Sequence, residues 1–264
     1  MSDAHVIAVI PARLGASRFP GKPLAPILGM PMVGHCALRT AMSPRVSSTH
    51  IATCDGEIAD YARSIGIDAV MTSERHERAS DRVAEAVQTI EYRTGRRSDV
   101  VVMVQGDEPM VTPAMISDAV DAMLGDPKVE VANLMAPIDD PGDFEDPNEI
   151  KVVVARNGDA LYFSRRPIPD DSRLGPATPR WKQVCIIPFR RDFLFRYLEL
   201  EPTALERAES IDMNRVLEYG FAVRMVPSRD RTVSVDTRED LEAVERLMAG
   251  DPLVGRYLRV EDAR

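Results

Sequence analysis

Residues that could bind a phosphate chain gather just behind a short apolar run near the N-terminus. Val6–Ile10 carries no charge and is typical of a buried strand. The dozen residues that follow contain two glycines, a serine hydroxyl and three cations, namely Gly15, Gly21, Ser17, Arg13, Arg18 and Lys22. Backbone N–H groups of a loop after a strand can bind an anion, and Arg and Lys supply charge for a polyphosphate. The loop therefore predicts a polyphosphate site, with a solvated basic turn as the alternative.

Two familiar phosphate-binding motifs do not fit this loop. A Walker A loop has four residues between its glycines, followed by Lys-Ser or Lys-Thr. Here five residues separate Gly15 from Gly21, and Pro23 stands where the magnesium-binding hydroxyl belongs. The dinucleotide pattern G-x-G-x-x-G is absent as well. The sequence thus disfavours a P-loop phosphotransferase and indicates a strand-linked basic loop of another kind.

Two acidic positions lie beside predicted elements where ligands can bind. Val100–Val104 is the most hydrophobic predicted strand, and Asp107 and Glu108 follow it. A carboxylate at the C-terminal end of a central strand lies where α/β sheets bind ligands, and beside a triphosphate it is a natural Mg²⁺ ligand. Asp236 precedes a helix whose start is marked by the capping box Thr237–Asp240. Each of these acids could instead only cap the helix that follows it.

Alternating strands and helices must position these groups. The pattern predicts strands at His50–Thr53, Ala69–Thr72, Glu130–Pro137, Gln183–Phe189 and Ala222–Val226, and a hairpin from Val152–Ala155 through Asn157-Gly158 to Ala160–Phe163. It predicts helices at Met30–Ala41, Glu57–Ser64, Asp192–Tyr197, Leu205–Tyr219, Asp240–Leu247 and from about Pro113, with loops over 139–147 and 173–180. Such alternation indicates βαβ units, so the expected fold class is α/β with a mainly parallel sheet.

Composition narrows the possible functions. Of 264 residues, 44% are hydrophobic and 28% are charged, which is typical of a globular protein, and the net charge of -9 argues against binding nucleic acid or an acidic membrane. No apolar run is long enough to span a membrane, and the N-terminus lacks the pattern of a secretory signal. Cys36, Cys54 and Cys185 form no C-x-x-C motif. We therefore expect reduced thiols in a cytoplasmic protein, without a structural zinc site.

Several motifs together resemble a known family. The loop after the first predicted strand is similar to the signature loop of sugar nucleotidyltransferases, in the form used by the CMP-KDO synthetase (3-deoxy-manno-octulosonate cytidylyltransferase) family. The residues that carry this resemblance are Pro11–Arg13, Ser17–Arg18 and Pro20–Leu24. The QGDEP motif at Gln105–Pro109 and the VDT-x-ED-L motif at Val235–Leu241 match the same family. The resemblance extends over nearly the whole chain, so we expect it to predict both the fold and the reaction.

The resemblance implies a Rossmann-like, mainly parallel sheet with flanking helices, of the nucleotide-diphospho-sugar transferase type, plus a small mixed β/α region. A single domain over residues 1–264 would comprise a CTP-binding half, 1–138, and an acceptor-binding and dimerisation half, 139–264. An oxygen of an acidic acceptor would attack the α-phosphorus of CTP, and pyrophosphate would leave. The implied partners are CTP, the acceptor and a second copy in a homodimer, with no nucleic acid and no membrane.

The resemblance also assigns roles to single residues. Asp107 and Asp236 would bind Mg²⁺, and Lys22, Arg18 and Asp107 would act in catalysis, by neutralising charge rather than by forming a covalent intermediate. The residues expected to contact CTP are Pro11, Ala12, Arg13, Leu14, Ser17, Arg18, Lys22, Ser80, Arg82 and Gln105. A catalytically silent nucleotide-binding subunit is the alternative from another functional class, and the two intact metal-binding acids argue against it.

The acceptor region departs from the family pattern. Gln183, Ile187 and Met213 stand where KDO-specific enzymes resembling this chain have sugar-contacting His, Tyr and Gln. Buried sugar hydroxyls without partners would cost roughly 1–3 kcal/mol each. In the segment Ser73–Glu85, Arg78 replaces a family Ser and adds a cation, unless this segment is only an Arg-rich helix start with a solvated face.

These departures favour a small, densely charged acceptor. We expect a phosphonate such as phosphonoformate, the kind of acceptor used by an offshoot of the family in phosphonate natural-product pathways. KDO or a related keto-sugar acid is the alternative. The residues expected to contact the acceptor are Arg78, Gln105, Glu149, Lys151, Arg165, Arg166, Gln183 and Met213.

Overall fold

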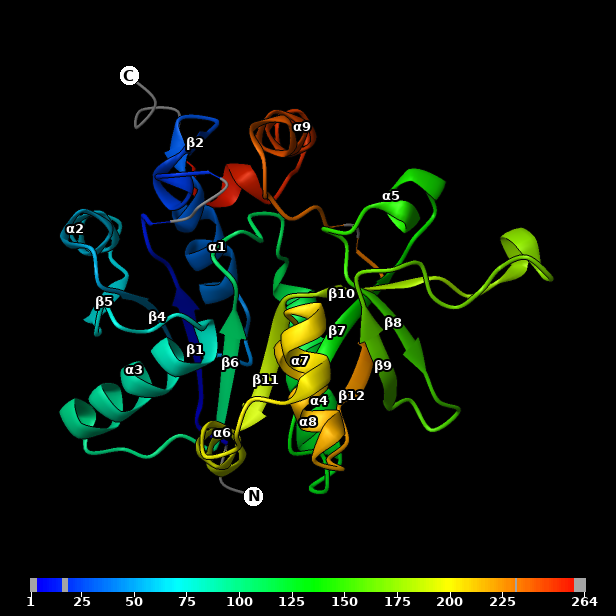
Figure 1. The fold of residues 1–264 in the computed structure, drawn as a ribbon. Coiled ribbons are helices and arrows are strands. Elements are labelled where there is room, and N and C mark those ends of the chain that lie inside the picture. Colours follow the sequence, from blue (N-terminus) through cyan, green and yellow to red (C-terminus); the bar gives the residue numbers. More distant parts are fainter. Residues whose placement is uncertain (1–3, 16–18, 231, 259–264) are drawn as a thin grey trace. The chain divides into compact units, whose positions relative to one another are not determined.

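The chain forms two compact units in the computed structural model, which describes residues 4–15, 19–230 and 232–258 (Figure 1). Unit 1 comprises Met1–Ser117 and Arg231–Arg264, and unit 2 comprises Asp118–Asp230. These bounds differ from the predicted halves 1–138 and 139–264, because the last part of the chain returns to unit 1. The functional division between those halves stays a prediction.

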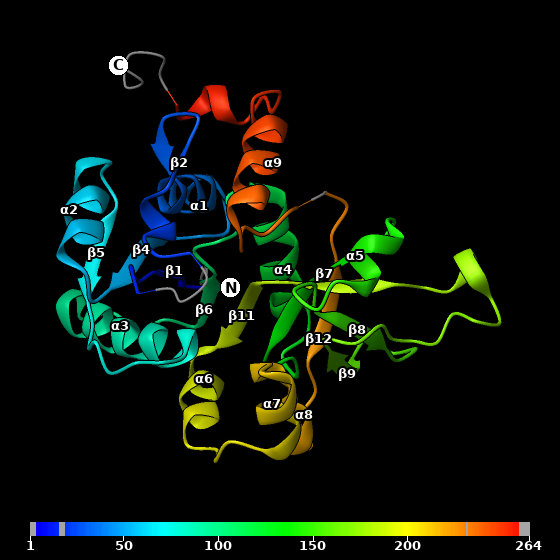
Figure 2. The same ribbon diagram turned by 45° about the horizontal axis from the view of Figure 1, so that its top comes forward.

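Unit 1 contains a parallel sheet between helices, as predicted. Its strands β1 (Val6–Pro11), β4 (Ser48–Thr53), β5 (Asp68–Met71) and β6 (Val100–Val104) pair in the order β6-β1-β4-β5, all parallel. Helices α1 (Met32–Ala41), α2 (Gly56–Ser64) and α3 (Ala79–Thr94) connect them. Right-handed crossovers put α1 and α2 on one face and α3 on the other, and Figure 2 shows these helices on either side of the strands.

The segment between β1 and α1 differs from the predicted helix at Met30–Ala41. Met30–Pro31 forms β3, which pairs antiparallel with β2 (Pro26–Ile27), so the helix begins two residues later. A short 3₁₀ turn, η1 (Lys22–Leu24), precedes this ladder. Helix α4 (Pro113–Gly125), which begins where Pro113 predicted, carries the chain across the boundary between the two units.

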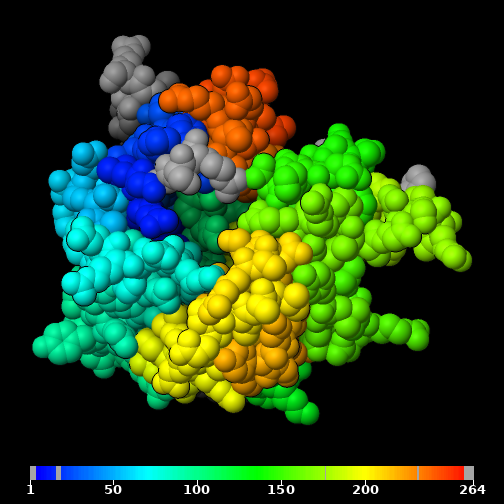
Figure 3. Space-filling view, in the orientation of Figure 1, coloured from blue at the N-terminus to red at the C-terminus, as the bar shows by residue number. Residues whose placement is uncertain are grey.

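The C-terminal part of unit 1 packs against its N-terminal part. Helix α9 (Arg238–Met248) buries Val244 and Met248 in a core cluster with Ile27, Met32 and Phe19. Figure 3 shows this segment, in orange, against the first segments of the chain, in blue. The predicted capping box is present, and the short turn η3 (Val254–Arg256) follows the helix. Residues far apart in sequence thus share one hydrophobic core.

Unit 2 holds the small mixed β/α region that was expected. Its sheet has the order β12-β7-β10-β8-β9, with antiparallel pairs except for β12 and β7. The strands are β7 (Ala132–Pro137), β8 (Lys151–Val154), β9 (Ala160–Ser164), β10 (Trp181–Val184) and β12 (Arg224–Pro227). The predicted hairpin joins β8 to β9, and Gly158 takes the left-handed conformation that its turn requires (φ 87). Helix α6 (Arg191–Leu198) follows β11 (Ile186–Arg190).

Four predicted elements of unit 2 differ from the structure. The single strand at Gln183–Phe189 is broken at Cys185 into β10 and β11. The acidic segment taken as a loop contains a short helix, α5 (Pro141–Glu145), because Asp140 caps its N-terminus and Phe144 is buried. The loop over 173–180 contains a 3₁₀ turn, η2 (Gly175–Ala177).

The predicted helix Leu205–Tyr219 is two helices, α7 (Ala204–Glu209) and α8 (Asp212–Glu218), separated by Ser210 at φ 55. The break lets the Arg215 guanidinium reach the buried Glu206 carboxylate at 2.6 and 2.7 Å. In one straight helix, residues nine positions apart would lie on opposite faces and about 13 Å apart along the axis. The bidentate ion pair is therefore possible only because the helix is broken.

A buried polar cluster ties the C-terminal turn to α1. The Nε2 atom of His35 donates to the carbonyl oxygen of Ile27 at 2.8 Å, so the neutral ring accepts from the Tyr257 hydroxyl at Nδ1, 2.7 Å away. The fully buried Arg39 donates to the same hydroxyl at 2.9 Å and to Asp251 at 2.5 Å. Burial lowers the pKa of His35 to about 4, and the charge of Arg39 acts in the same direction.

This shift predicts a loss of stability in mild acid. Below pH 6.5 the unfolded chain protonates His35 while the folded protein does not until about pH 4, so stability falls over that window. Between pH 7 and pH 5, His35 should lower the free energy of unfolding by about 2 kcal/mol. Urea unfolding at the two pH values should show that His35→Gln, which keeps a donor toward Ile27, has a pH dependence weaker by about that amount. An unchanged pH dependence would contradict the assignment.

Candidate functional site

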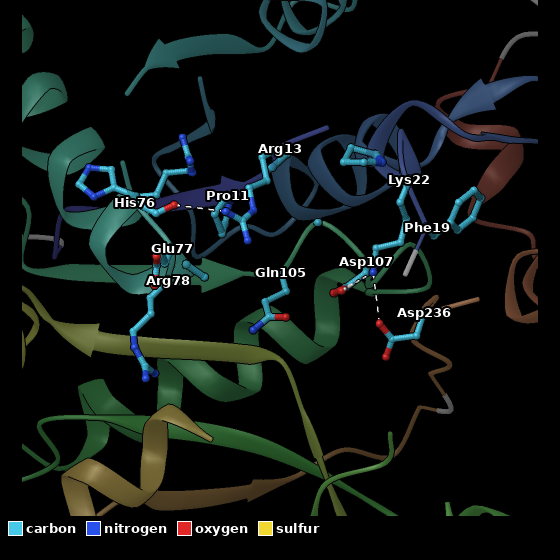
Figure 4. Close-up of a pocket in the computed structure, with 15 residues that line it drawn as sticks. Pro11, Arg13, Phe19, Lys22, His76, Glu77, Arg78, Gln105, Asp107 and Asp236 are labelled. Atoms are coloured by element: carbon cyan, nitrogen blue, oxygen red, sulfur yellow. Dashed lines mark hydrogen bonds and ion pairs between the residues drawn. The ribbon is translucent and has the colours of Figure 1, made fainter. Parts of the chain in front are cut away.

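A pocket of about 310 Å³ lies in unit 1 at the C-terminal ends of β1 and β6 (Figure 4). The chain runs from β1 toward β5 on one side and returns to β6 on the other, so this is the point where the strand order reverses. Ligands bind at such switch points in open α/β sheets. The lining residues are Pro11, Ala12, Arg13, Phe19, Lys22, Pro23, His76, Glu77, Arg78, Ala79, Arg82, Gln105, Gly106, Asp107 and Asp236.

Lys22 joins the two acids that the motifs marked as metal ligands. Its Nζ atom lies 2.9 Å from Oδ2 of Asp107, 3.4 Å from Oδ1 of Asp236 and 2.7 Å from the carbonyl oxygen of Val235. All three side chains are largely buried, with 13% of Lys22, 23% of Asp107 and 19% of Asp236 exposed. Burial lowers the pKa of Lys22, but Asp107 and Asp236 outweigh it, so the pKa is raised and the amine is charged.

Backbone and side-chain contacts hold the two acids together from opposite ends of the sequence. The amide of Val235 donates to the carbonyl oxygen of Asp107 at 3.0 Å. The Thr232 hydroxyl donates to the buried carboxyl group of Glu108 at 3.0 Å. Asp240 accepts from the amide of Asp236 at 2.9 Å, which fixes the residue just before α9. The convergence of the two acids is therefore built into unit 1.

Gly106 lets the loops behind β1 and β6 approach each other. A Cβ atom at this position would lie 3.0 Å from the carbonyl oxygen of Pro11, which is closer than nearly all real contacts of that atom. A side chain at this position would force the backbone at Pro11 to shift, so glycine suits the close packing of Gly106 against Pro11, both of which line the pocket.

The other end of the pocket is cationic. Arg13 donates to the carbonyl oxygen of His76 at 3.5 Å, and the His76 ring pairs with Glu85. Arg82 is buried and donates to the Thr72 hydroxyl at 2.5 Å, while its Nη2 atom has no hydrogen-bond partner among the described residues. A buried guanidinium nitrogen without an acceptor is suited to an anionic ligand, because burial without a partner is costly.

Only some of the residues expected to contact CTP line the pocket. Pro11, Ala12, Arg13, Lys22, Arg82 and Gln105 line the pocket together. Ser80 is buried in the first turn of α3 and does not line it. The amide of Leu14 already donates to Asp55 at 2.8 Å. Ser17 and Arg18 lie outside the described residues, so their roles stay predictions.

Of the expected acceptor-contacting residues, Arg78 and Gln105 line the pocket. The others belong to unit 2, where several already have partners. Lys151 is fully buried and donates to the carbonyl oxygens of Asp146 and Glu149, each at 2.7 Å. Gln183 donates to Asn133 at 2.5 Å.

Four further acceptor candidates also lie in unit 2. Glu149 accepts from Lys182 at 2.8 Å, and Arg165 donates to the carbonyl oxygens of Glu209 and Pro147 at 2.8 and 2.9 Å. Met213 is buried and Arg166 is exposed. Glu149 and Arg165 thus have partners within unit 2, and the acceptor roles of all four residues stay predictions.

Sequence reasoning missed the residues that support the site. Asp55, Thr232 and Glu108 position the loop backbone and the two acids, yet none of them stood out as a supporting residue. Asp55 comes shortly after a predicted strand, and the sequence suggests for Glu108, beside Asp107, only a role as a helix cap. The signal that would find them is pairing between distant segments, which a single sequence does not reveal.

The donor set suits a hard divalent cation shared with a nucleotide. Asp107 and Asp236 offer carboxylate oxygens around one point, which Mg²⁺ prefers. Within the described ranges, no cluster of three or more His, Cys, Asp or Glu could hold a metal ion without help. Two protein carboxylates would leave positions for phosphate oxygens, as in sites where Mg²⁺ binds with its nucleotide.

Comparison with known proteins identifies the class. A family model described as cytidylyltransferase matches residues 7–231. The 3-deoxy-manno-octulosonate cytidylyltransferase of Geobacter metallireducens is 41% identical over 249 residues, which cover 90% of this chain and 96% of that protein. The enzyme of the same name from Solibacter usitatus is 40% identical over 250 residues, 95% of this chain and 97% of its own.

Solved structures agree with these matches. The structure of a CMP:2-keto-3-deoxy-manno-octonic acid synthetase complexed with CTP has a TM-score of 0.84 and 36% identity, covering 93% of this chain and 99% of that one. A cytidylyltransferase from Leptospira borgpetersenii, with a TM-score of 0.62 and 18% identity, shares the fold. The protein is therefore a cytidylyltransferase, an enzyme of the nucleotidyltransferase class. Within that class, the chain belongs to the 3-deoxy-manno-octulosonate cytidylyltransferase (CMP-KDO synthetase) family.

Among the described residues, no helix combines the length and the apolar character that a membrane span needs.

The Thr232–Glu108 contact predicts a specific loss of stability. Thr232→Val removes the hydroxyl donor from a buried carboxyl group, so the free energy of unfolding should fall by about 1–3 kcal/mol. Thr232→Ser keeps the donor and should stay close to the wild-type value. Urea unfolding of the three proteins measures this difference. Equal stability of the Val and Ser variants would show that the hydroxyl does not support the Asp107 loop.

Proposed function

We propose that this chain transfers CMP from CTP to 3-deoxy-manno-octulosonate, or a closely related keto-sugar acid, with release of pyrophosphate. The observation that carries the proposal is the convergence of Lys22, Asp107 and Asp236 in one pocket at the switch point of the sheet. Relatives that cover nearly the whole chain bear the name of this activity, and a similar solved structure is described as a complex with CTP.

The keto-sugar acid is preferred over the phosphonate that the residue replacements suggested. Those replacements lie at Gln183, Ile187 and Met213, all in unit 2, where Gln183 is bonded to Asn133 and Met213 is buried. A side chain that is already hydrogen-bonded or buried within the protein is weak support for an acceptor other than the keto-sugar acid. The relatives named for 3-deoxy-manno-octulosonate match this chain over at least 90% of its length, which supports the alternative.

In the proposed reaction the chain mainly orients substrates and balances charge. Mg²⁺ bound at Asp107 and Asp236 would supply charge neutralisation for the triphosphate and its leaving group. Arg13 and the guanidinium group of Arg82, whose Nη2 has no partner among the residues that the structure describes, would donate to anionic oxygens of the nucleotide at the other end of the pocket. Gln105, between the two ends, would orient the nucleotide or the acceptor by its amide. In-line geometry and preorganised charge are what such a transfer requires.

The acceptor can be identified by pyrophosphate release. Wild-type protein with CTP and Mg²⁺ should release pyrophosphate when 3-deoxy-manno-octulosonate is added, and only at background without an acceptor. Phosphonoformate and other small phosphonates should give little release. Release with phosphonoformate alone would establish the phosphonate alternative. Tight CTP binding without release by any acceptor would favour the silent nucleotide-binding subunit.

The two acids should be needed together. Asp107→Asn or Asp236→Asn removes charge and a hard ligand at the site, so kcat should fall by about 100-fold or more. Mn²⁺ titration in the presence of CTP should show weaker metal binding by both variants. Asp118→Asn, an exposed position of α4, is the matched control and should keep both properties. Full activity of either pocket variant would remove that acid from the mechanism. The expected homodimer is a separate prediction.

A further inference from the structure

The ammonium group of Lys22 has no donor to spare in this structure. It carries three N–H bonds, and three acceptors surround it: Asp107, Asp236 and the carbonyl oxygen of Val235. A lysine that binds phosphate needs at least one of these donors. In these contacts, all three donors of Lys22 are committed within the protein.

The position of the ammonium also overlaps the place for a metal ion. Mg²⁺ binds carboxylate oxygens at about 2.0–2.1 Å. The Lys22 Nζ atom lies 2.9 and 3.4 Å from the two carboxylate oxygens that would bind it, between Asp107 and Asp236, as Figure 4 shows. A cation bridging the same two oxygens would meet Nζ at close range, and two positive charges so close would repel strongly.

Without a cation, the paired acids would be unfavourable. Asp107 and Asp236 each lie within 3.4 Å of the same nitrogen and are largely buried, so their charges would repel each other. Lys22 offsets this repulsion. Its backbone is held by hydrogen bonds to Phe19 at 3.1 Å and from Ala25 at 3.0 Å, and Pro23 follows it, so the four-carbon side chain is the part with the most freedom to move.

We propose that Lys22 is an internal stand-in cation, which keeps the metal site assembled until a divalent cation displaces it. This inference rests on the proposed roles of Asp107 and Asp236. The displaced ammonium then turns toward the phosphate oxygens of the nucleotide in the same pocket. Release from the acids costs less when phosphate receives the ammonium, so the divalent cation and CTP bind cooperatively.

Chemical labelling of lysine tests the displacement directly. Acetic anhydride modification, quantified by mass spectrometry, should become several-fold faster at Lys22 when Mg²⁺ alone is added to the full-length protein. Lys128, which is exposed, is the internal control and should not respond. An unchanged rate at Lys22, at metal concentrations that fill the site, would overturn the proposal because both cations would then coexist.

Metal binding to a lysine variant provides the second arm. Lys22→Met should bind Mn²⁺ alone about tenfold or more tightly than wild type, and CTP should strengthen that binding less than in wild type. In metal-free buffer the variant should melt at a lower temperature and regain stability with Mg²⁺, whereas wild type should change little. Lys128→Met is the matched control. Equal or weaker Mn²⁺ binding by Lys22→Met, or no binding by either protein, would overturn the proposal.

These results are separable from failure of the proposed function. If the acceptor panel gives pyrophosphate release while Lys22 labelling ignores Mg²⁺, only the stand-in role is lost. If no acceptor supports release and Asp107→Asn leaves Mn²⁺ binding unchanged, the proposed metal site itself fails, and the stand-in role fails with it.

Discussion

The interaction on which unit 1 depends is the charge cluster of Lys22, Asp107 and Asp236. Its members come from the loop behind β1, the turn behind β6 and the segment before α9, separated by 85 and 214 residues along the chain. A cation between two largely buried carboxylates is stable only if all three remain close, because each charge left alone would be costly to bury. The cluster thus joins parts of the pocket that come from distant segments of the chain.

The return of the C-terminal segment to unit 1 follows from the same constraint. Asp236 can reach Asp107 only if the chain after unit 2 comes back to the C-terminal edge of the parallel sheet. Backbone pairing by Val235, the core around Val244 and the bonds from Arg39 to Asp251 and Tyr257 all favour that return. The cavity is therefore completed by a segment whose stability comes from apolar packing and buried polar contacts elsewhere in the unit.

Local pattern predicted much of this fold. β6 matches its predicted bounds because a fully apolar run has few alternatives. The Thr237–Asp240 capping box is present, and α9 begins at Arg238, two residues before the predicted Asp240. The local pattern predicted the wrong structure where contacts between distant residues determine it. An example is the helix break that lets Arg215 reach Glu206. The sequence motifs predicted that Lys22, Asp107 and Asp236 belong to one site. Their direct contact was not predicted, because spacing along the sequence says nothing about which distant groups share a hydrogen bond.

Unit 2 shows why residue type alone is a poor guide to the acceptor. The sequence presents Lys151 as a cation for an acidic substrate, yet its ammonium is fully buried against two carbonyl oxygens. Removing it would leave those acceptors unpaired, so its presence has a structural explanation. A donor already committed within the fold adds little to binding. Arg82 lines the pocket, and its buried Nη2 lacks a partner among the described residues, so it is a stronger indication of where an anion binds.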